Sequence, residues 1–205
     1  MRTRILSIDE IGSIVLAKQM LERGGLVAFP TDTVYGLGVM AFNPLAIDQL
    51  YTVKGRDPSK AIAVLLGDMD ALAQVANKIK TTTLLLAERF WPGPLTLIMP
   101  QNPALPSNLS PLPTIGVRMP DHKFALALLN QTGPLAVTSA NLSGRPNTTT
   151  AEEVSEQLKG HINLILDGGK TPGGLPSTVV DCTSDELLIL RQGPITRAQL
   201  LSALT

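Results

Sequence analysis

The stretch LVAFPTDTVYGLG, residues 26–38, joins a short apolar run to a loop of small and hydroxyl-bearing residues. Four apolar residues closed by Pro30 are typical of a strand that is buried within a sheet. Upstream, residues 7–10 have the Ser-x-x-Glu spacing of a capping box, apolar residues follow at helical intervals, and Gly24 ends the predicted helix. The order of helix, buried strand and polar loop favours an α/β protein.

Turn residues divide the rest of the chain into further helices and strands. Asn43 followed by Pro44 predicts the cap and first turn of a helix that ends at Gly55. Helices and strands alternate early and strands dominate late, which predicts a twisted sheet of mixed direction with helices packed on it, in one domain over residues 1–205. The predicted strands are 26–29, 61–66, 95–99, 114–119, 134–138, 162–167, 177–182 and 186–191, and further helices are expected after Asp68, over 82–90 and 121–131, from Thr150 to Lys159, and after Thr196.

Composition limits the classes of function. Hydrophobic residues make up 44% of the chain and the mean hydropathy is +0.20, which indicates a folded protein. A net charge of zero and an aromatic content of 3% argue against a nucleic-acid-binding or membrane-surface protein. The one cysteine, Cys182, excludes an intramolecular disulfide and a zinc site built from cysteines. No apolar run is long enough for a signal peptide or a membrane span, so a cytoplasmic protein is predicted.

Two glycine patterns resemble phosphate-binding motifs but lack the helix that such motifs require. Gly36-x-Gly38-x-x-Ala41 fits a loose dinucleotide pattern, yet the next helix is delayed to Pro44. Gly169-Lys170-Thr171 resembles the end of a P-loop, but Pro172 blocks a helix at that point. Both stretches are interpreted as turns.

The stretch VKGRDPSK, residues 53–60, places three cations in eight residues of a formally neutral chain. Lys54 falls in the last turn of the predicted helix, where a cation can simply complement the helix dipole. That explanation does not extend to Arg56 and Lys60, which lie on the loop that leads into the strand at 61–66. Three converging cations would suit a polyphosphate, because charge-assisted hydrogen bonds are strong.

Two polar stretches follow predicted strands at positions where α/β proteins bind ligands. Residues 138–146, TSANLSGRP, follow the strand at 134–138, and residues 30–38, PTDTVYGLG, follow the strand at 26–29. Each stretch taken alone is equally compatible with an ordinary polar turn. Their order in one chain is more informative than either stretch.

Together these stretches resemble the YrdC-like family, the threonylcarbamoyl-AMP synthases that act in the first step of the t6A modification of tRNA. The resemblance runs from about Gly24 to Gly193, and the Lys-x-Arg and Ser-x-Asn motifs are its hallmark. The family's larger members carry an additional C-terminal domain, for which this chain is too short. The matching stretches are PTDTVYGLG (30–38), Lys54-x-Arg56, FWPGPLT (90–96), GVRMPDH (116–122), SANLSGRP (139–146), STVVD (177–181) and LRQG (190–193).

The resemblance implies a YrdC-like fold with a concave ligand site and an enzyme that converts L-threonine, bicarbonate and ATP into L-threonylcarbamoyladenylate and pyrophosphate. It implies Lys54 and Arg56 as catalytic residues and downstream t6A transferase proteins as partners. A magnesium ion is expected with the triphosphate, and the sequence shows no acidic cluster to hold it. The resemblance implies threonine binding by Thr33, Arg118, Ser139 and Ser177, and ATP binding by Lys54, Arg56, Lys60, Thr114, Asn141, Thr149 and Arg191.

Three positions depart from the family pattern. Asp57 stands where a proline usually follows the arginine, Lys60 stands where many members have asparagine, and Leu65 occupies a position that is often histidine. These differences affect the Lys60 contact and the detail of the threonine pocket, whereas the implied class of reaction is unchanged.

Arg118 has two interpretations. Its neighbours along the chain are apolar, so its guanidinium is expected in a partly enclosed cavity, where a charge requires a partner. The partner is either an acid of the protein, in a structural ion pair, or the carboxylate of threonine, whose planar geometry a guanidinium matches.

Two other functions remain open. A YrdC-like fold could bind structured RNA, although the neutral charge and the scarcity of aromatic residues argue against it. Alternatively, the chain could be a carbamoyl-transfer domain, as in the hydrogenase-maturation proteins. Those domains lie in much longer chains that carry zinc-finger cysteines, so the synthase is favoured.

Overall fold

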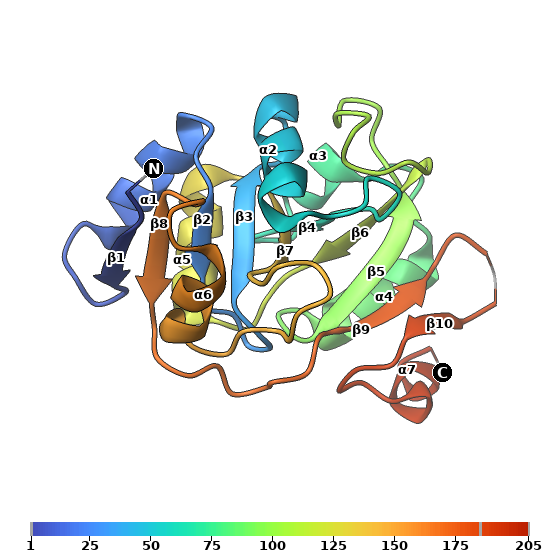
Figure 1. Ribbon diagram of the computed structural model, residues 1–205. Helices are drawn as coiled ribbons and strands as arrows, with labels where there is room; N and C mark the ends of the chain where they lie inside the picture. Colours follow the sequence, from blue (N-terminus) through green and yellow to red (C-terminus); the bar gives the residue numbers. More distant parts are fainter. Residues whose placement is uncertain (1, 185, 205) are drawn as a thin grey trace.

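The computed structural model describes residues 2–184 and 186–204 and contains one ten-stranded sheet with helices on both faces (Figure 1). The strands lie side by side in the order β1-β8-β2-β3-β7-β4-β6-β5-β9-β10. The elements are β1 (Arg4–Ser7), α1 (Ser13–Glu22), β2 (Val27–Phe29), β3 (Gly36–Met40), α2 (Pro44–Lys54), β4 (Ala63–Leu65), α3 (Leu72–Val75), α4 (Thr81–Phe90), β5 (Leu95–Pro100), β6 (Thr114–Arg118), α5 (Lys123–Thr132), β7 (Leu135–Ser139), α6 (Ala151–Leu158), β8 (Leu164–Asp167), β9 (Thr178–Asp181), β10 (Leu188–Arg191) and α7 (Arg197–Ser202).

The sheet mixes parallel and antiparallel pairs, which confirms the predicted α/β class. Four neighbouring pairs run parallel, namely β1 with β8, β2 with β8, β4 with β6 and β5 with β9. The pairs β2 with β3, β3 with β7, β4 with β7, β5 with β6 and β9 with β10 run antiparallel. None of the helices in the described part of the chain combines the length and the hydropathy needed to cross a membrane.

The two faces of the sheet are covered differently. On one face, side chains such as Leu37, Val64 and Leu97 are buried in a large core with residues of α2, α4 and α6. On the other face, α1 and α5 pack over Val27, Leu135 and their neighbours. Because side chains alternate along a strand, the pairing registers also determine which residues of β4, β6, β5 and β9 lie on this second face. There it carries small and polar residues that line a cavity, among them Ala63, Gly116, Thr96 and Val179.

The predicted start of the first helix, at Ser7, is wrong. Ser7 does not cap a helix: Arg4–Ser7 forms the edge strand β1, parallel to β8, and the Ser7 hydroxyl accepts a hydrogen bond from the Asp9 amide at 3.2 Å. The helix begins later, at Ser13, and Gly12 precedes it in the left-handed conformation with a φ of 88°. Backbone pairing with β8 therefore outweighs the local capping pattern.

The glycines of residues 36–38 form a strand and not a turn. They belong to β3, which pairs with β2 on one side and β7 on the other. A Cβ atom on Gly36 would lie 2.8 Å from Val137 Cγ1, and one on Gly38 would lie 2.9 Å from Phe29 Cε1. These glycines are required because large neighbouring side chains cover them.

The helix predicted from Asn43 to Gly55 is confirmed. The Asn43 side chain accepts a hydrogen bond from the Ala46 amide at 3.1 Å, Pro44 occupies the first turn, and Gly55 ends the helix with a φ of 57°. This helix carries Lys54 at its last position and so leads directly to the stretch of three cations.

We predict that Asn43→Ala lowers the free energy of unfolding by about 1 kcal/mol, because the Ala46 amide loses its cap. The matched variant Asn43→Asp retains a capping oxygen and should stay close to wild type. Urea unfolding of the three proteins measures the difference, and equal stability of the alanine and aspartate variants would contradict the role of the cap.

Candidate active site

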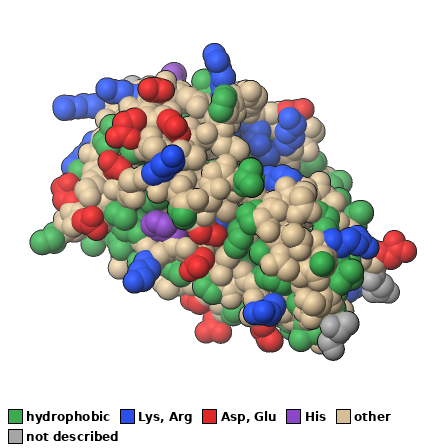
Figure 2. Space-filling view, turned by 90° about the horizontal axis from the view of Figure 1, so that it is seen from below, with side chains coloured by type: hydrophobic (Ala, Val, Ile, Leu, Met, Phe, Trp, Pro, Cys, Tyr) green, Lys and Arg blue, Asp and Glu red, His purple; other side chains and the backbone are tan. Residues whose placement is uncertain are grey.

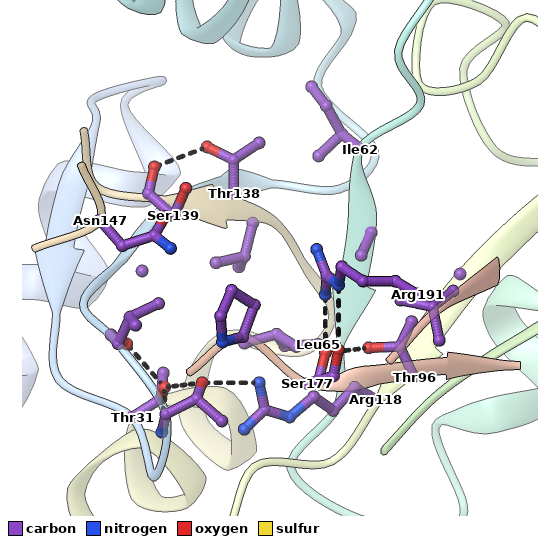
Figure 3. Close-up of a pocket in the computed structure, with 18 of the residues that line it drawn as sticks. Thr31, Ile62, Leu65, Thr96, Arg118, Thr138, Ser139, Asn147, Ser177 and Arg191 are labelled. Atoms are coloured by element: carbon purple, nitrogen blue, oxygen red, sulfur yellow. Dashed lines mark hydrogen bonds between the residues drawn. The ribbon is translucent and has the colours of Figure 1, made fainter. Parts of the chain in front are cut away.

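A cavity of about 290 Å³ lies on the second face of the sheet, beyond the part that α1 and α5 cover (Figure 3). The ladder brings its lining residues together from distant parts of the chain: Ala63 pairs with Val137, Gly116 with Ile98, and Thr96 with Val179. The residues that line it are Thr31, Thr33, Val34, Tyr35, Gly36, Arg56, Ala61, Ile62, Ala63, Leu65, Thr96, Ile98, Gly116, Arg118, Val137, Thr138, Ser139, Asn147, Pro176, Ser177, Val179 and Arg191.

Positive charge dominates this lining. Arg56, Arg118 and Arg191 all contribute to it, and none of the lining residues in the described part of the chain is an aspartate or glutamate. Burial lowers the pKa of each of these arginines from its ordinary value, and the charge of Arg191 further lowers the pKa of Arg118. Three cations that are partly removed from water favour an anionic ligand.

Arg118 is held in one orientation at the end of β6. Its Nε donates to the Gly93 carbonyl at 2.9 Å, its Nη1 donates to Thr33 Oγ1 at 3.0 Å, and its Nη2 forms an ion pair with Asp32. The structural ion pair anticipated as one interpretation is therefore present. The three bonds use three of the five guanidinium N–H groups. One N–H group remains on each terminal nitrogen, so the pair with Asp32 does not use all the donors of the guanidinium.

Asp32 was not predicted as a site residue, although it lies within the quoted PTDT stretch. Its side chain is 11% exposed, and its second oxygen, Oδ2, is buried without a hydrogen-bond partner among the described residues. Removal of one partner from a buried ion pair leaves the other charge uncompensated.

We therefore predict that Asp32→Asn destabilises the protein by roughly 3–5 kcal/mol, because the Arg118 charge stays buried without its acid. The exposed Asp70 provides the control, since Asp70→Asn should change stability by less than about 0.5 kcal/mol. Thermal or urea unfolding measures both effects. If Asp32→Asn were as stable as Asp70→Asn, the pair would not be an important stabilising contact.

Ser177 lies at the centre of a chain of hydrogen bonds. Its hydroxyl is 2.7 Å from Thr96 Oγ1, and Arg191 donates to its carbonyl at 3.0 Å and to its hydroxyl at 3.1 Å (Figure 3). Gly193 packs against the backbone of residues 176–178, where an added Cβ atom would lie 2.4 Å from the Thr178 amide. The C-terminal strand is thereby fixed against the site.

An irregularity in β10 directs Arg191 toward the cavity. Ile189 pairs with Val180, which is buried in the large core, whereas Arg191 pairs with Val179, which lines the cavity. Residues two apart on a regular strand point to the same face, so the register shift between them reverses the direction of Arg191. Leu190, which is 53% exposed, is the additional residue.

Arg56 lies in the cavity with its guanidinium bound to the loop that follows it. Its Nε donates to the Lys60 carbonyl at 3.1 Å and its Nη2 donates to the Ala61 carbonyl at 2.8 Å. Asp57, which replaces the family's proline, accepts a hydrogen bond from the Ser59 amide at 2.9 Å and so shapes the same turn. The side chain of Lys60 is exposed and outside the cavity lining, and its carbonyl is the part that contacts Arg56.

The other predicted residues fall into two groups. Thr33, Arg118, Ser139 and Ser177, implied for threonine, all line the cavity, as do Arg56 and Arg191, implied for ATP. Lys54, Thr114, Asn141 and Thr149 lie outside the lining. Thr114 is on the same face of β6 as Gly116 and Arg118, whereas Thr149 donates through its amide and its hydroxyl to Glu153. Their roles toward ATP stay predictions.

The cavity contains further residues that the sequence did not single out, namely Thr31, Thr96, Thr138 and Asn147. Thr31 Oγ1 donates to the Val34 carbonyl at 2.7 Å and lies 3.1 Å from Thr33 Oγ1. Leu65, the ladder partner of Arg118, is an apolar part of the lining at the position that is often histidine in the family.

Lys54 is 3% exposed, and both desolvation and the nearby charge of Arg56 lower its pKa to about 7. The unfolded chain keeps the ordinary pKa of 10.5, so between these values the unfolded state binds more protons than the folded state. Lys54 should therefore make stability rise with pH between these two pKa values, and below about pH 7 its contribution should stay constant because both states hold the proton.

We predict that wild-type protein gains about 1.5 kcal/mol of unfolding free energy between pH 7 and pH 8.5 relative to Lys54→Met, which lacks this titration. Urea unfolding at the two pH values measures the gain. The comparison stays below pH 9 because burial also raises the pKa of Cys182 to about 11, which has the opposite effect on stability at higher pH. Parallel pH profiles for the two proteins would contradict the shift.

The sequence matches the model of the Sua5/YciO/YrdC family, described as "Telomere recombination", over residues 19–193. The chain belongs to this family. It is 44% identical over 193 residues to the threonylcarbamoyl-AMP synthase of Bacillus subtilis, with 91% of this chain and 55% of that protein covered. It is 37% identical to a putative threonylcarbamoyl-AMP synthase of Mycobacterium tuberculosis, with 93% and 88% covered.

Among solved structures, the chain is similar to the Pyrococcus abyssi Sua5 complexed with L-threonine. The TM-score is 0.93 at 36% identity, and the match covers 99% of this chain and 60% of the P. abyssi chain. The chain thus spans little more than half the length of the B. subtilis and P. abyssi relatives.

Proposed function

We propose that this family member is an L-threonylcarbamoyladenylate synthase, which forms L-threonylcarbamoyladenylate and pyrophosphate from L-threonine, bicarbonate and ATP. Its relatives are named for this activity, and P. abyssi Sua5 has been observed with L-threonine bound. The single observation that carries the proposal is the cavity itself, in which three arginines converge with the hydroxyls of Thr33, Ser139 and Ser177.

Threonine fits the part of the cavity around Arg118. Each terminal nitrogen of the guanidinium has one N–H group left for the α-carboxylate, and Asp32, Thr33 and Gly93 have already fixed its orientation. Leu65 and Val137 provide apolar surface for the methyl group, and the hydroxyls of Ser139 and Ser177 are near for polar contacts. In this placement Arg118 can keep its ion pair with Asp32 and bind the threonine carboxylate at the same time.

The reaction requires positioning and charge neutralisation more than covalent help. The threonine amine combines with bicarbonate to a carbamate with loss of water, and a carbamate oxygen then attacks the α-phosphorus of ATP. The bond to the β-phosphate oxygen breaks and pyrophosphate leaves. Negative charge develops on the phosphoryl oxygens, where Arg56 and Arg191 are placed to stabilise it.

Magnesium enters this proposal only as part of the ATP substrate. The described residues contain no group of three or more His, Cys, Asp or Glu that could hold a metal ion. Mg²⁺ commonly binds through substrate phosphates and water with few protein ligands.

The product is a mixed anhydride, and the proposed role is to supply it to t6A transferase proteins that modify tRNA. Direct binding of RNA is not part of the proposal. Acidic and basic side chains are interspersed over the face shown in Figure 2, in keeping with a net charge of zero.

The test is pyrophosphate release from ATP, measured with threonine and bicarbonate added separately and together. Full release should require both, and Arg118→Lys should raise the threonine KM by roughly 10- to 100-fold while ATP affinity stays near wild type. An ammonium keeps the charge but loses the fork, which is why the effect should be confined to threonine.

Thermal unfolding of Arg118→Lys controls for loss of structure. Release that ignores threonine, or that responds equally to carbamoyl phosphate, would refute the synthase and favour a carbamoyl-transfer activity. A steep salt dependence of RNA affinity, without any pyrophosphate release, would indicate an RNA-binding module instead.

A further inference from the structure

The side chain of Lys54 is buried and does not belong to the lining of the cavity. It is the last residue of α2, and its Nζ donates to the carbonyl oxygens of both Ser139 and Asn141. The backbone carbonyl of Lys54 accepts a hydrogen bond from the Ser143 amide at 2.9 Å. Three hydrogen bonds thus tie this one residue to the turn that follows β7.

Asn141 closes the same turn from within. Its Nδ2 donates to the Leu142 carbonyl at 2.8 Å and to the Arg145 carbonyl at 2.9 Å. The residue is 6% exposed, and its Oδ1 is buried without a partner among the described residues. The Nδ2 group of Asn141 therefore supports the shape of residues 139–145.

The other member of each motif has the opposite placement. Arg56 lies two residues after Lys54 and lines the cavity, and Ser139 lies two residues before Asn141 and also lines it. The Lys-x-Arg and Ser-x-Asn motifs therefore contact each other through Lys54. Each motif also contributes one side chain to the cavity lining, Arg56 from the first and Ser139 from the second.

We propose that Lys54 is a positioning residue, which locks residues 139–145 against the end of α2, and that Arg56 makes the ligand contact of the Lys-x-Arg motif. The proposal rests on the proposed function, since it assigns roles within the same site. It replaces the expectation that Lys54 is a catalytic residue.

Loss of the lock and loss of a ligand contact should change the affinities for ATP and threonine in different ways. The carbonyls that Lys54 bridges belong to Ser139, implied for threonine, and to Asn141, implied for ATP. Loss of the lock should release the whole turn and weaken both ligands together. Loss of Arg56, whose bonds go to residues 60 and 61, should affect ATP alone.

The experiment compares Lys54→Met with the matched variant Arg56→Met, which removes a cation two residues away. Binding of ATP and of threonine is measured separately by calorimetry, and hydrogen exchange is followed in a peptide that spans residues 139–145. For Lys54→Met we expect both affinities to fall by similar factors, on the order of 10- to 100-fold, with faster exchange in that peptide. For Arg56→Met we expect weaker ATP binding, unchanged threonine binding and wild-type exchange.

A loss of ATP affinity alone in Lys54→Met, with wild-type exchange of residues 139–145, would overturn the lock and make Lys54 a direct phosphate contact. If the wild-type chain bound neither ATP nor threonine, the proposed function would fail, whereas faster exchange in Lys54→Met would still support the structural lock.

A measurement on the wild-type protein keeps the proposal testable if Lys54→Met does not fold. Lysine acetylation is quantified by mass spectrometry with and without ATP plus threonine. Lys54 should stay unmodified in both conditions, while the exposed Lys60 serves as the reactive reference. Modification of Lys54 that only the ligands prevent would show that its amine faces the ligand site, and would overturn the proposal.

Discussion

The alternation of side chains along the strands is the constraint on which this site depends. Once Leu135 and Val27 face α1 and α5, every second residue of the neighbouring strands must face the same side. That side becomes the floor of the cavity where the two helices no longer cover it. Small residues such as Ala63 and Gly116 leave the space open, and the register places Arg118 beside Leu65. The core and the site are therefore two parts of one face.

Buried cations impose a second requirement, because each needs a partner before any ligand arrives. Arg118 has Asp32, Thr33 and Gly93, and Lys54 has the carbonyls of Ser139 and Asn141. These partners hold both cations in place. At Arg118 they use only three of the five N–H groups of the guanidinium. Preorganisation of this kind lowers the reorganisation needed when charge develops on a substrate.

The sequence predicted the parts of the fold that local chemistry controls. Asn43, Pro44 and Gly55 specify the ends of α2 by themselves, and Thr150 caps α6 through its bond to the Glu153 amide as predicted. The same local rules failed at Ser7 and at Gly36, where pairing with distant strands determines the structure. Strand pairing joins residues far apart in the chain, and no local pattern contains that information.

In the candidate site, too, local patterns identified some residues, whereas others depend on contacts between distant parts of the chain. The family motifs led to Arg56, Arg118, Ser139, Ser177 and Arg191, all of which line the cavity. Nothing in the sequence distinguished Asp32 from the hydroxyl residues around it, since its role appears only when β6 brings Arg118 opposite. The direction of the Arg191 side chain likewise depends on the additional residue Leu190 in β10. A pattern of alternating apolar residues does not reveal that irregularity.

A chain with no net charge can therefore contain a strongly positive cavity, because the location of each charge matters more than the total. Asp32 pairs with Arg118 but lies outside the lining, so it compensates the buried guanidinium while the lining residues themselves include no carboxylate. Arg56 and Arg191 are bound by carbonyl and hydroxyl oxygens, which carry no full charge. Their positive charges are oriented but not neutralised. The arginines are therefore in position before an anion enters the cavity, and the charge of the anion is what neutralises them.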